Sequence, residues 1–400
     1  MRLDMKVQHV FIIGSKGIPS AYGGYETFVD KLTEYHKNES SIKYHVACKA
    51  NGRGTSAEMA KRESRFEYHN ADCFKVDVPE IGAAEAIVYD CRAFKMCLTY
   101  IEKHQIEHPI VYVLTCRIGP FLANYKRKLE SLGGEMYLNP DGHEWKRAKW
   151  SKPVRWYWKK SEELMIKQAD LVICDSKNIE KYIKDTYKQY NPRTTYIAYG
   201  AETKPSLLAD NDEKIVHWYK KWQLSKESYY LVVGRFVPEN NFETMIREFM
   251  LSSSKKSLAI ITTKDDKFLK QLDESLGFTK DKRIKFVGTV YDSELLKKIR
   301  ENAYAYIHGH EVGGTNPSLL EALGSTPLNL LLDVGFNREV GQEAALYWKK
   351  DTGSLSSLIN KAEQIEAHKR YLIEKQAKKR IHTVYSWDFI GSEYLKIWLK

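Results

Sequence analysis

Short apolar runs alternate along the chain with segments of helical length and mixed polarity. Seven apolar runs in the first half predict strands, at 7–14, 44–50, 73–79, 109–116, 135–139, 169–176 and 194–200. Helices are predicted between several of them, at 24–37, 83–103 and 121–132. Continuous apolar strands separated by helices are typical of parallel sheets covered on both faces, so this half is predicted to form an α/β domain.

A second series of the same kind follows the polar stretch 201–212. Its predicted strands lie at 229–236, 257–263, 283–290, 303–310 and 327–334, and a helical segment is predicted over 354–380. The last stretch has apolar side chains at helical spacing, which predicts an amphipathic helix. A chain of 400 residues is long enough for two domains. We therefore predict an N-terminal domain over 1–204, a C-terminal domain over 205–382 and a final helix over 383–400.

Composition narrows the classes of function. The formal net charge of +11 favours an anionic partner, such as a nucleic acid, an acidic lipid surface or a phosphorylated ligand. The six cysteines form no C-x-x-C pair and the histidines no H-E-x-x-H pattern, so neither disulfides nor a bound metal is predicted. No apolar run is long enough to span a bilayer, and the first residues lack a signal-peptide pattern. A cytoplasmic protein is therefore expected.

The motif with the most specific chemistry is HGHEVGGTNPSLLEALG, at 308–324. Asn316 is a favourable helix N-cap and Pro317 a favourable first helical residue, after two glycines that let the loop bend. The loop should therefore present main-chain N–H groups to an anion such as phosphate. Glu321, one turn into the helix, could accept hydrogen bonds from the two hydroxyls of a ribose. An ordinary glycine turn before a capped helix, with a solvated glutamate, is equally consistent with this pattern.

Two further loops follow predicted strands. Arg235 stands at the carboxyl end of the strand in LVVGRFVPENN, where α/β sheets bind ligands, and its planar fork of donors suits a diphosphate. The alternative is an exposed surface arginine.

After the first strand come Gly14, Gly17, Gly23 and Gly24. Their spacing is not that of a dinucleotide fingerprint, but they let the backbone approach a ligand. The alternative is an ordinary connection between a strand and a helix.

A turn of sequence Asn-Pro-Asp-Gly ends the predicted strand 135–139. It places Asp141, His143 and Glu144 at the mouth of an expected cleft. Asp141 could act as a base or orient an acceptor hydroxyl. The alternative, an Asx turn made by Asp141, is favoured by turn chemistry alone.

The segment 145–160 contains seven lysines and arginines, five Trp or Tyr residues and no acidic residue. Interleaved basic and aromatic side chains suit an anionic membrane surface or a single-stranded nucleic acid. A basic helix whose aromatic side chains partly enter the core would have the same composition.

Together, the stretches IIGSKGIPSAYGGYETFV, NPDGHEWKRAKW, VGRFVPENN and HGHEVGGTNPSLLEALG resemble glycosyltransferase family 4. The resemblance extends over both halves and is closest to bacterial rhamnosyltransferases of capsule and cell-wall polysaccharide synthesis. It implies the GT-B fold, an α/β architecture in which two Rossmann-like domains with parallel sheets face each other across a cleft. It also implies that the final helix crosses back to the N-terminal domain.

The resemblance further implies a nucleotide-sugar donor held mainly by the C-terminal domain. Arg235 would hold the diphosphate, Glu321 the ribose, and the loop 313–316 the phosphate and the donor sugar. The implied donor-site residues are Arg235, Asn240, Gly313, Gly314, Thr315, Asn316 and Glu321, with Gly23 and Gly24 from the N-terminal domain. The implied acceptor and membrane contacts are Glu26, His143, Lys146, Arg147, Lys149 and Trp150, beside the catalytic candidate Asp141.

Two positions depart from the broad family. Gly313 stands where the family usually has a glutamate, eight residues before its second one, and Glu311 is out of register. Asn240 stands where the family usually has a lysine. Both departures resemble those of the rhamnosyltransferase branch. They leave less positive charge than usual near the diphosphate. Lys16 could supply part of the missing charge.

Our interpretation is transfer of L-rhamnose from dTDP-rhamnose to a lipid-diphosphate-linked sugar, at the inner face of the cell membrane. The resemblance implies retention of configuration without a metal or other cofactor, and no nucleic acid takes part. Three alternatives stay open: a UDP-hexose-dependent enzyme of the same fold, a GT-B-like sugar-nucleotide epimerase, and a nucleic-acid-binding protein. The last would not explain the helix start at Pro317 with Glu321 beside it.

Overall fold

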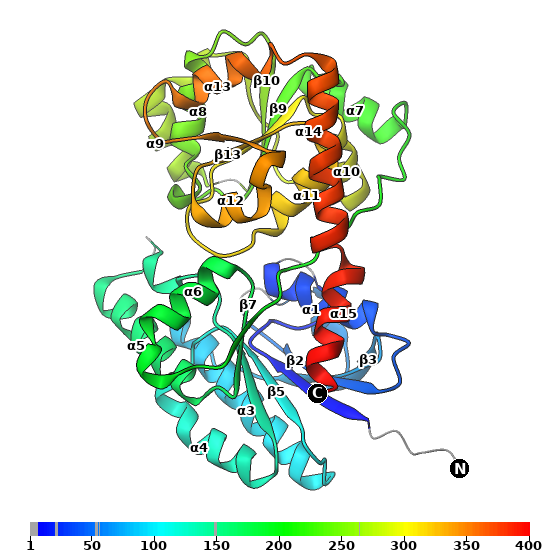
Figure 1. Ribbon diagram of the computed structural model, residues 1–400, viewed down its shortest axis with the longest axis vertical. Helices are drawn as coiled ribbons and strands as arrows, with labels where there is room; N and C mark the ends of the chain where they lie inside the picture. Colours follow the sequence, from blue (N-terminus) through cyan, green and yellow to red (C-terminus); the bar gives the residue numbers. More distant parts are fainter. Residues whose placement is uncertain (1–6, 21–22, 53–54, 56, 148–149, 264) are drawn as a thin grey trace. The chain divides into compact units, whose positions relative to one another are not determined.

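The structure is a computed structural model that describes residues 7–20, 23–52, 55, 57–147, 150–263 and 265–400. The chain divides into two compact units (Figure 1). The N-terminal unit comprises Met1–Gly200 together with Trp387–Lys400, and the C-terminal unit comprises Ala201–Ser386. The division therefore lies slightly before the boundary drawn from sequence, and the last residues of the chain belong to the first unit.

The N-terminal unit contains, in its described ranges, an eight-stranded sheet of order β3-β4-β2-β1-β5-β6-β7-β8. Its strands are β1 (Gln8–Ile13), β2 (Ile42–Lys49), β3 (Arg65–Tyr68), β4 (Ala71–Val76), β5 (Ile110–Leu114), β6 (Glu135–Asn139), β7 (Leu171–Cys174) and β8 (Thr194–Tyr196). Its helices are α1 (Gly24–Tyr35), α2 (Ala57–Lys61), α3 (Glu85–Lys103), α4 (Gly119–Ser131), α5 (Lys152–Gln168), α6 (Lys177–Thr186) and α15 (Trp387–Trp398). All strand pairs are parallel except β3 with β4.

Strands and helices of this unit share one apolar core. Every residue of β5 is buried, as expected for a central strand covered on both faces. Helix α3 buries one stripe, which includes Phe94, Cys97, Leu98 and Ile101, against that sheet. The spacing of these side chains is that of a single helical face, so the pattern in the sequence and the packing agree.

Helix α15 is an integral part of the N-terminal unit, where it lies beside α1 (Figure 1). The hydroxyls of Tyr394 and Tyr112 are 3.0 Å apart, and the indole of Trp398 donates to the hydroxyl of Tyr44 over 2.9 Å. Gly391 leaves room for the ring of Tyr35, which lies 2.2 Å from where a Cβ atom would be. Because Tyr394 and Trp398 are buried, the unit's core is completed by residues that follow the whole C-terminal unit in sequence.

The C-terminal unit contains, in its described ranges, a six-stranded parallel sheet of order β11-β10-β9-β12-β13-β14. Its strands are β9 (Tyr229–Val233), β10 (Ser257–Ile261), β11 (Ile284–Phe286), β12 (Ala305–His308), β13 (Asn329–Leu332) and β14 (Leu346–Trp348). Its helices are α7 (Glu213–Trp222), α8 (Phe242–Leu251), α9 (Asp266–Leu276), α10 (Ser293–Glu301), α11 (Pro317–Ser325), α12 (Gly335–Gly341), α13 (Ser354–Ala362) and α14 (Ala367–Arg380). The predicted helix 354–380 is thus two helices.

Each sheet has one place where the strand order reverses. In the N-terminal unit the chain runs from β1 to β2 on one side and later returns to β5 on the other; in the C-terminal unit β9 and β12 have the same relation. Ligands of open α/β sheets bind outside the carboxyl ends of such a pair of strands. We call these places the N-terminal and C-terminal switch points. Among the described residues, no helix is both long and apolar enough to cross a membrane.

Candidate functional site

Two of the motifs singled out from the sequence meet at the C-terminal switch point. The loop with Arg235 follows β9, and the loop 309–316 follows β12. Because β9 and β12 are paired in parallel, both loops leave the same edge of the sheet. The side chain of Asn241 joins them, donating from Nδ2 to the carbonyl of Gly309 over 2.8 Å. The fold therefore brings together residues that are far apart in sequence.

The N-terminus of α11 has the predicted cap. Asn316 Oδ1 accepts hydrogen bonds from the main-chain N–H groups of Ser318 and Leu319, over 2.9 and 3.3 Å. Gly313 has a φ of 135°, a conformation that residues with side chains rarely adopt. Within the described part of the chain, the N–H groups of Gly313 and Gly314 donate to no other group of the protein. They precede the positive end of a helix, so this loop suits a phosphate.

Arg235 is exposed directly after the end of β9. Asn240, one of the implied donor-site residues, is 3% exposed, and its Nδ2 donates to the carbonyl of Arg235 over 2.7 Å. The amide of Asn240 thus shapes the loop that carries the arginine. An exposed guanidinium on a loop fixed in this way can meet a diphosphate with little further ordering.

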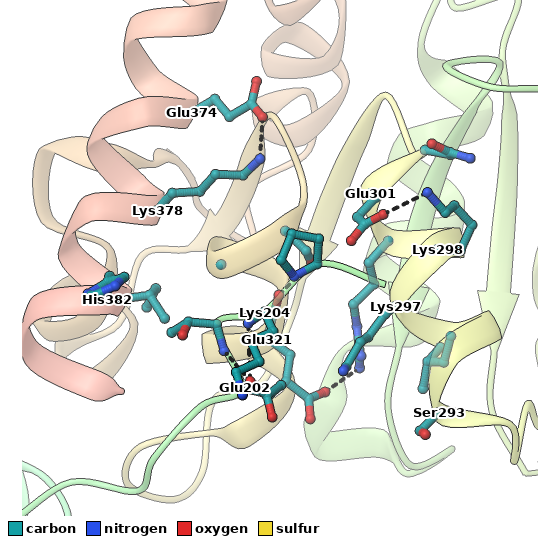
Figure 2. Close-up of a pocket in the computed structure, with 18 of the residues that line it drawn as sticks. Glu202, Lys204, Ser293, Lys297, Lys298, Glu301, Glu321, Glu374, Lys378 and His382 are labelled. Carbon is teal, nitrogen blue, oxygen red and sulfur yellow. Dashed lines mark hydrogen bonds and ion pairs between the residues drawn. The ribbon is translucent and has the colours of Figure 1, made fainter. Parts of the chain in front are cut away.

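Glu321 lies on the wall of a cavity of about 440 Å³ within the C-terminal unit. Figure 2 shows Glu321, from α11, together with Ser293 and Lys297, from α10, among the side chains that line it. Glu321 is not simply solvated, because its Oε2 atom lies 2.6 Å from Nη2 of Arg300. The arginine side chain is 5% exposed and the glutamate side chain 40%. Arg300 therefore holds one side of the carboxylate, and the other side faces the cavity.

The glycine loop of the N-terminal switch point packs tightly against its own unit. Gly14 has a φ of 96°, and a Cβ atom there would lie 2.1 Å from the carbonyl oxygen of Leu114, at the end of β5. Glu26 is buried and accepts a hydrogen bond from the main-chain N–H of Lys16 over 2.8 Å. A Cβ atom on Gly23 would lie 1.8 Å from the carboxylate of Glu26. Glu26, an implied acceptor contact, is thus directed into the loop and holds it, while the side chain of Lys16 is exposed.

The turn after β6 owes its shape to Asn139 rather than to Asp141. Asn139 Oδ1 accepts hydrogen bonds from the main-chain N–H of Asp141 over 3.0 Å and from the hydroxyl of Tyr25 over 3.2 Å. Asp141 is half-buried with a φ of 59°, which is unusual for a residue with a side chain. Among the described residues, its Oδ1 accepts a hydrogen bond only from the adjacent N–H of Gly142, over 2.8 Å. The carboxylate is therefore not needed to make the turn.

The segment that follows Asp141 is anchored by an aromatic cage. Nζ of Lys159, on α5, lies 4.8 Å from the ring centres of Trp145 and Tyr182 and 4.9 Å from that of Tyr187. His143 packs on Tyr182, with ring centres 4.2 Å apart. Burial, with the charges of nearby lysines, lowers the pKa of His143 to about 4, so its imidazole is neutral at physiological pH. This cage ties the Asp141 turn to α5.

The basic and aromatic residues after this turn divide into two groups. Arg147 and Trp150 are half-buried and contact Glu144, through an ion pair and an indole hydrogen bond of 2.9 Å. Lys146 is exposed, and Lys149 lies outside the described residues. On α5, Lys152, Trp156 and Lys160 recur every four residues and are exposed, with Trp156 70% exposed. The exposed basic and aromatic face is thus on α5, within the segment 145–160 but beyond the implied contacts Lys146, Arg147, Lys149 and Trp150.

The N-terminal switch point also holds residues that the sequence analysis missed. Nη1 of Arg117, which follows β5, donates to the carbonyl of Gly14 over 3.0 Å and to Asp90 over 3.2 Å. Asp90 is fully buried, and burial raises its pKa to about 6 although Arg117 opposes the shift. Thr115, between β5 and Arg117, has a φ of 82°. Arg235 was selected because it follows the end of a strand, and Arg117 has the same position after β5. The same criterion could therefore have identified Arg117.

Asp265 has a structural role. Asp265 caps α9, accepting from the N–H of Phe268 over 3.0 Å. Among the described residues there is no group of three or more His, Cys, Asp or Glu side chains placed to hold a metal ion.

Comparisons with known proteins agree with this architecture. A sequence profile for a family described as "Domain of unknown function (DUF1972)" matches residues 7–202. No curated protein matches the chain. Among solved structures, sucrose-phosphate synthase from Thermosynechococcus elongatus is similar, with a TM-score of 0.75, 17% identity and 98% of each chain covered.

Two further solved structures are similar over the same extent. Alpha,alpha-trehalose 6-phosphate synthase from Burkholderia multivorans has a TM-score of 0.74 and 11% identity, with 98% of each chain covered. HepE of Anabaena, in complex with UDP-glucose, has a TM-score of 0.69 and 12% identity, again with 98% of each chain covered. These structures are GT-B glycosyltransferases, and the likeness shows the fold. The chain has the GT-B fold, with two Rossmann-like domains and a final helix that packs on the N-terminal one.

Proposed function

We propose that the protein is a glycosyltransferase that uses a sugar nucleotide as donor. The observation that carries this proposal is the C-terminal switch point. There, an exposed arginine and a loop with available N–H groups leave the same sheet edge. One turn further along α11, Glu321 faces a cavity whose lining does not include that arginine or that loop. Donors for phosphates beside an acceptor for sugar hydroxyls are the groups that a nucleoside diphosphate requires.

For the donor we propose dTDP-L-rhamnose, and for the acceptor a sugar linked to lipid through a diphosphate. The support is the set of motifs shared with bacterial rhamnosyltransferases, including Gly313 and Asn240 at the two positions that depart from the broad family. A UDP-hexose is the second candidate, because HepE, which has the same fold, is known in complex with UDP-glucose.

The proposed chemistry retains the configuration of the sugar and uses no metal or other cofactor. The leaving diphosphate removes the proton of the acceptor hydroxyl, and the N–H groups at the start of α11 stabilise the charge that develops on it. Asp141 orients the acceptor or assists proton transfer; its carboxylate is available because Asn139 makes the turn.

The proposed acceptor is anchored in lipid, so the enzyme would act at the inner face of the cell membrane. The exposed face of α5, with Lys152, Trp156 and Lys160, supports this proposal. Basic side chains are attracted to anionic headgroups, and tryptophan partitions into the interface. The cage around Lys159 links α5 to the Asp141 turn, which would bring the acceptor headgroup near the reacting groups.

The test is a panel of ligands followed by an assay of the product. Nucleotide sugars, free nucleotides and single-stranded DNA are compared for protection against heat unfolding, since a ligand at a hundred times its Kd adds about 2.7 kcal/mol of stability. The protein is then incubated with a lipid-linked sugar and either dTDP-rhamnose or UDP-glucose. The masses of the products are measured by mass spectrometry. Transfer of a sugar to an acceptor is expected. An altered nucleotide sugar formed without an acceptor would indicate an epimerase, and protection by DNA alone would indicate a nucleic-acid-binding protein.

A further inference from the structure

The cavity between α10 and α11 contains an ion pair with unequal surroundings. Nη2 of Arg300 and Oε2 of Glu321 are 2.6 Å apart, and the arginine is almost completely buried. Glu321 is among the side chains that line the cavity (Figure 2). Among the described residues, no side chain or main-chain donor contacts the other carboxylate oxygen, Oε1. Glu321 therefore offers one oxygen that is already engaged and one that is open.

Arg300 is fixed from several sides. Its carbonyl accepts a hydrogen bond from the hydroxyl of Thr326 over 3.0 Å, and its guanidinium lies 3.5 Å from the hydroxyl of Ser318. That hydroxyl is 3.3 Å from the hydroxyl of Tyr306, which donates to the carbonyl of Val233 over 3.0 Å. The arginine is thus tied to the start of α11 and, through Tyr306, to the end of β9. A guanidinium held in this way keeps its direction.

We propose that Arg300 determines which class of nucleoside the donor site accepts, by occupying one oxygen of Glu321. This inference rests on the proposed function. A carboxylate with both oxygens open binds the adjacent 2′- and 3′-hydroxyls of a ribose together. With Oε2 engaged by Arg300, the oxygen without a protein partner is Oε1, and in this proposal it binds the 3′-hydroxyl. Oε2, which already accepts from a charged donor, gains little from a 2′-hydroxyl. The site then accepts 2′-deoxyribonucleoside diphosphates as readily as ribonucleoside diphosphates.

The physical reason is whether an acceptor of the protein loses its hydrogen bond when a nucleotide without the 2′-hydroxyl binds. A site rejects an analogue that lacks a hydroxyl when the hydroxyl's partner in the protein loses its hydrogen bond on binding the analogue. Here the absence of a 2′-hydroxyl leaves Oε2 with its bond to Arg300, so no buried acceptor becomes unsatisfied. Arg300 thus acts as a positioning and specificity-determining residue through Glu321.

The test compares UDP with dUDP, which differ only in the 2′-hydroxyl. Affinities are measured by titration calorimetry on the full-length protein. For the wild type, the two dissociation constants should agree within about threefold, which is less than one hydrogen bond to a charged group would contribute. In Arg300→Met, Oε2 is released to a second hydroxyl, and UDP should bind at least about tenfold more tightly than dUDP.

Lys298→Met is the matched control. Lys298 lies on the same helix and lines the same cavity, but its ammonium pairs with Glu301 over 3.1 Å and with Asp210 over 3.3 Å. Its ratio of affinities should equal that of the wild type. Because the ratio is taken between two ligands on one sample, partial unfolding of a variant does not change it, and Arg300→Lys provides a second, charge-preserving variant.

Two results would overturn the role of Arg300 and leave the proposed function standing. One is a wild type that prefers UDP over dUDP by tenfold or more, and the other is a ratio of affinities that Arg300→Met leaves unchanged. Absence of binding by both nucleotides would overturn the proposed function and this assignment with it.

Discussion

Single side chains at the C-terminal switch point carry the proposed donor site. Arg235 is exposed and its loop is held by Asn240, whereas Glu321 is directed by Arg300. In the proposed site the two groups would contact different parts of the same ligand, so each should contribute to its affinity independently.

Replacing Arg235 with alanine should weaken nucleotide binding by about 1.5–3 kcal/mol, the contribution of a hydrogen bond to a charged group. The fold should persist, because the side chain is exposed. Calorimetric titration with dTDP and UDP measures the loss, and far-ultraviolet circular dichroism checks the fold. Arg247→Ala, on α8, is a suitable control for loss of charge. Unchanged affinity in Arg235→Ala would remove Arg235 from the site.

Asp141→Asn should lower turnover by at least about 100-fold if the carboxylate assists the acceptor. The substitution keeps the size of the side chain, and Asn139 maintains the turn, so donor affinity should change little. Steady-state kinetics with saturating donor and a lipid-linked acceptor give the comparison. Near-normal turnover would leave Asp141 with no part in the chemistry.

Asp90 predicts a pH dependence of stability. Its pKa is about 6 in the folded protein, above the ordinary value of 3.8, so between these values the folded state binds more protons than the unfolded state. The free energy of unfolding of the wild type should therefore fall as pH rises from about 4 to about 6, relative to Asp90→Asn, which has no proton to lose there. Urea unfolding of both proteins at several pH values measures the difference. A constant difference would show that Asp90 does not titrate in this range.

Among the elements, central strands were predicted from sequence because they are continuously apolar, whereas two edge strands, β3 and β14, were not. β3 alternates between exposed and half-buried residues at an antiparallel edge, and β14 has three residues. The helical segment 354–380 divides at 363–366, where the sequence contains no glycine or proline to mark the break. For the site, the caps and loops could be predicted because they depend on local sequence. The inward direction of Glu26 and the pairing of Asp90 with Arg117 could not, since both depend on which strands become neighbours.

Helix α5 carries the prediction about membranes. Replacing Lys152 and Lys160 with glutamine and Trp156 with serine should reduce binding to vesicles of anionic lipid. Each basic residue near such a surface contributes up to about 1 kcal/mol at low salt. Sedimentation with vesicles, at low and high salt, measures the effect, and transfer to a short water-soluble acceptor should be preserved.

The matched control replaces Lys267 and Lys270 with glutamine on the exposed face of α9, in the other unit. It removes the same number of charges without touching α5. Equal vesicle binding by all three proteins would assign the exposed face of α5 to another purpose.

At the scale of the whole molecule, α15 makes the N-terminal unit depend on the end of the chain. Trp398→Ala removes a side chain that is 1% exposed and should destabilise this unit by about 3–5 kcal/mol. Nucleotide binding by the C-terminal unit should be largely retained, because Arg235, the loop 313–316 and Glu321 all lie within Ala201–Ser386. Calorimetric unfolding should show one transition shifted to lower temperature and a second, still raised by nucleotide, unchanged. A uniform shift of both transitions would mean that the units unfold together.

The return of α15 to the first unit also sets an order of events during synthesis. The C-terminal unit is one uninterrupted stretch, whereas the N-terminal unit is assembled from Met1–Gly200 and Trp387–Lys400. A chain leaving the ribosome can therefore complete the C-terminal unit while the unit begun first still lacks Tyr394 and Trp398. Until those residues emerge, the surface around Tyr44 and Tyr112 that they cover is unprotected, and it is there that a nascent chain would need a chaperone.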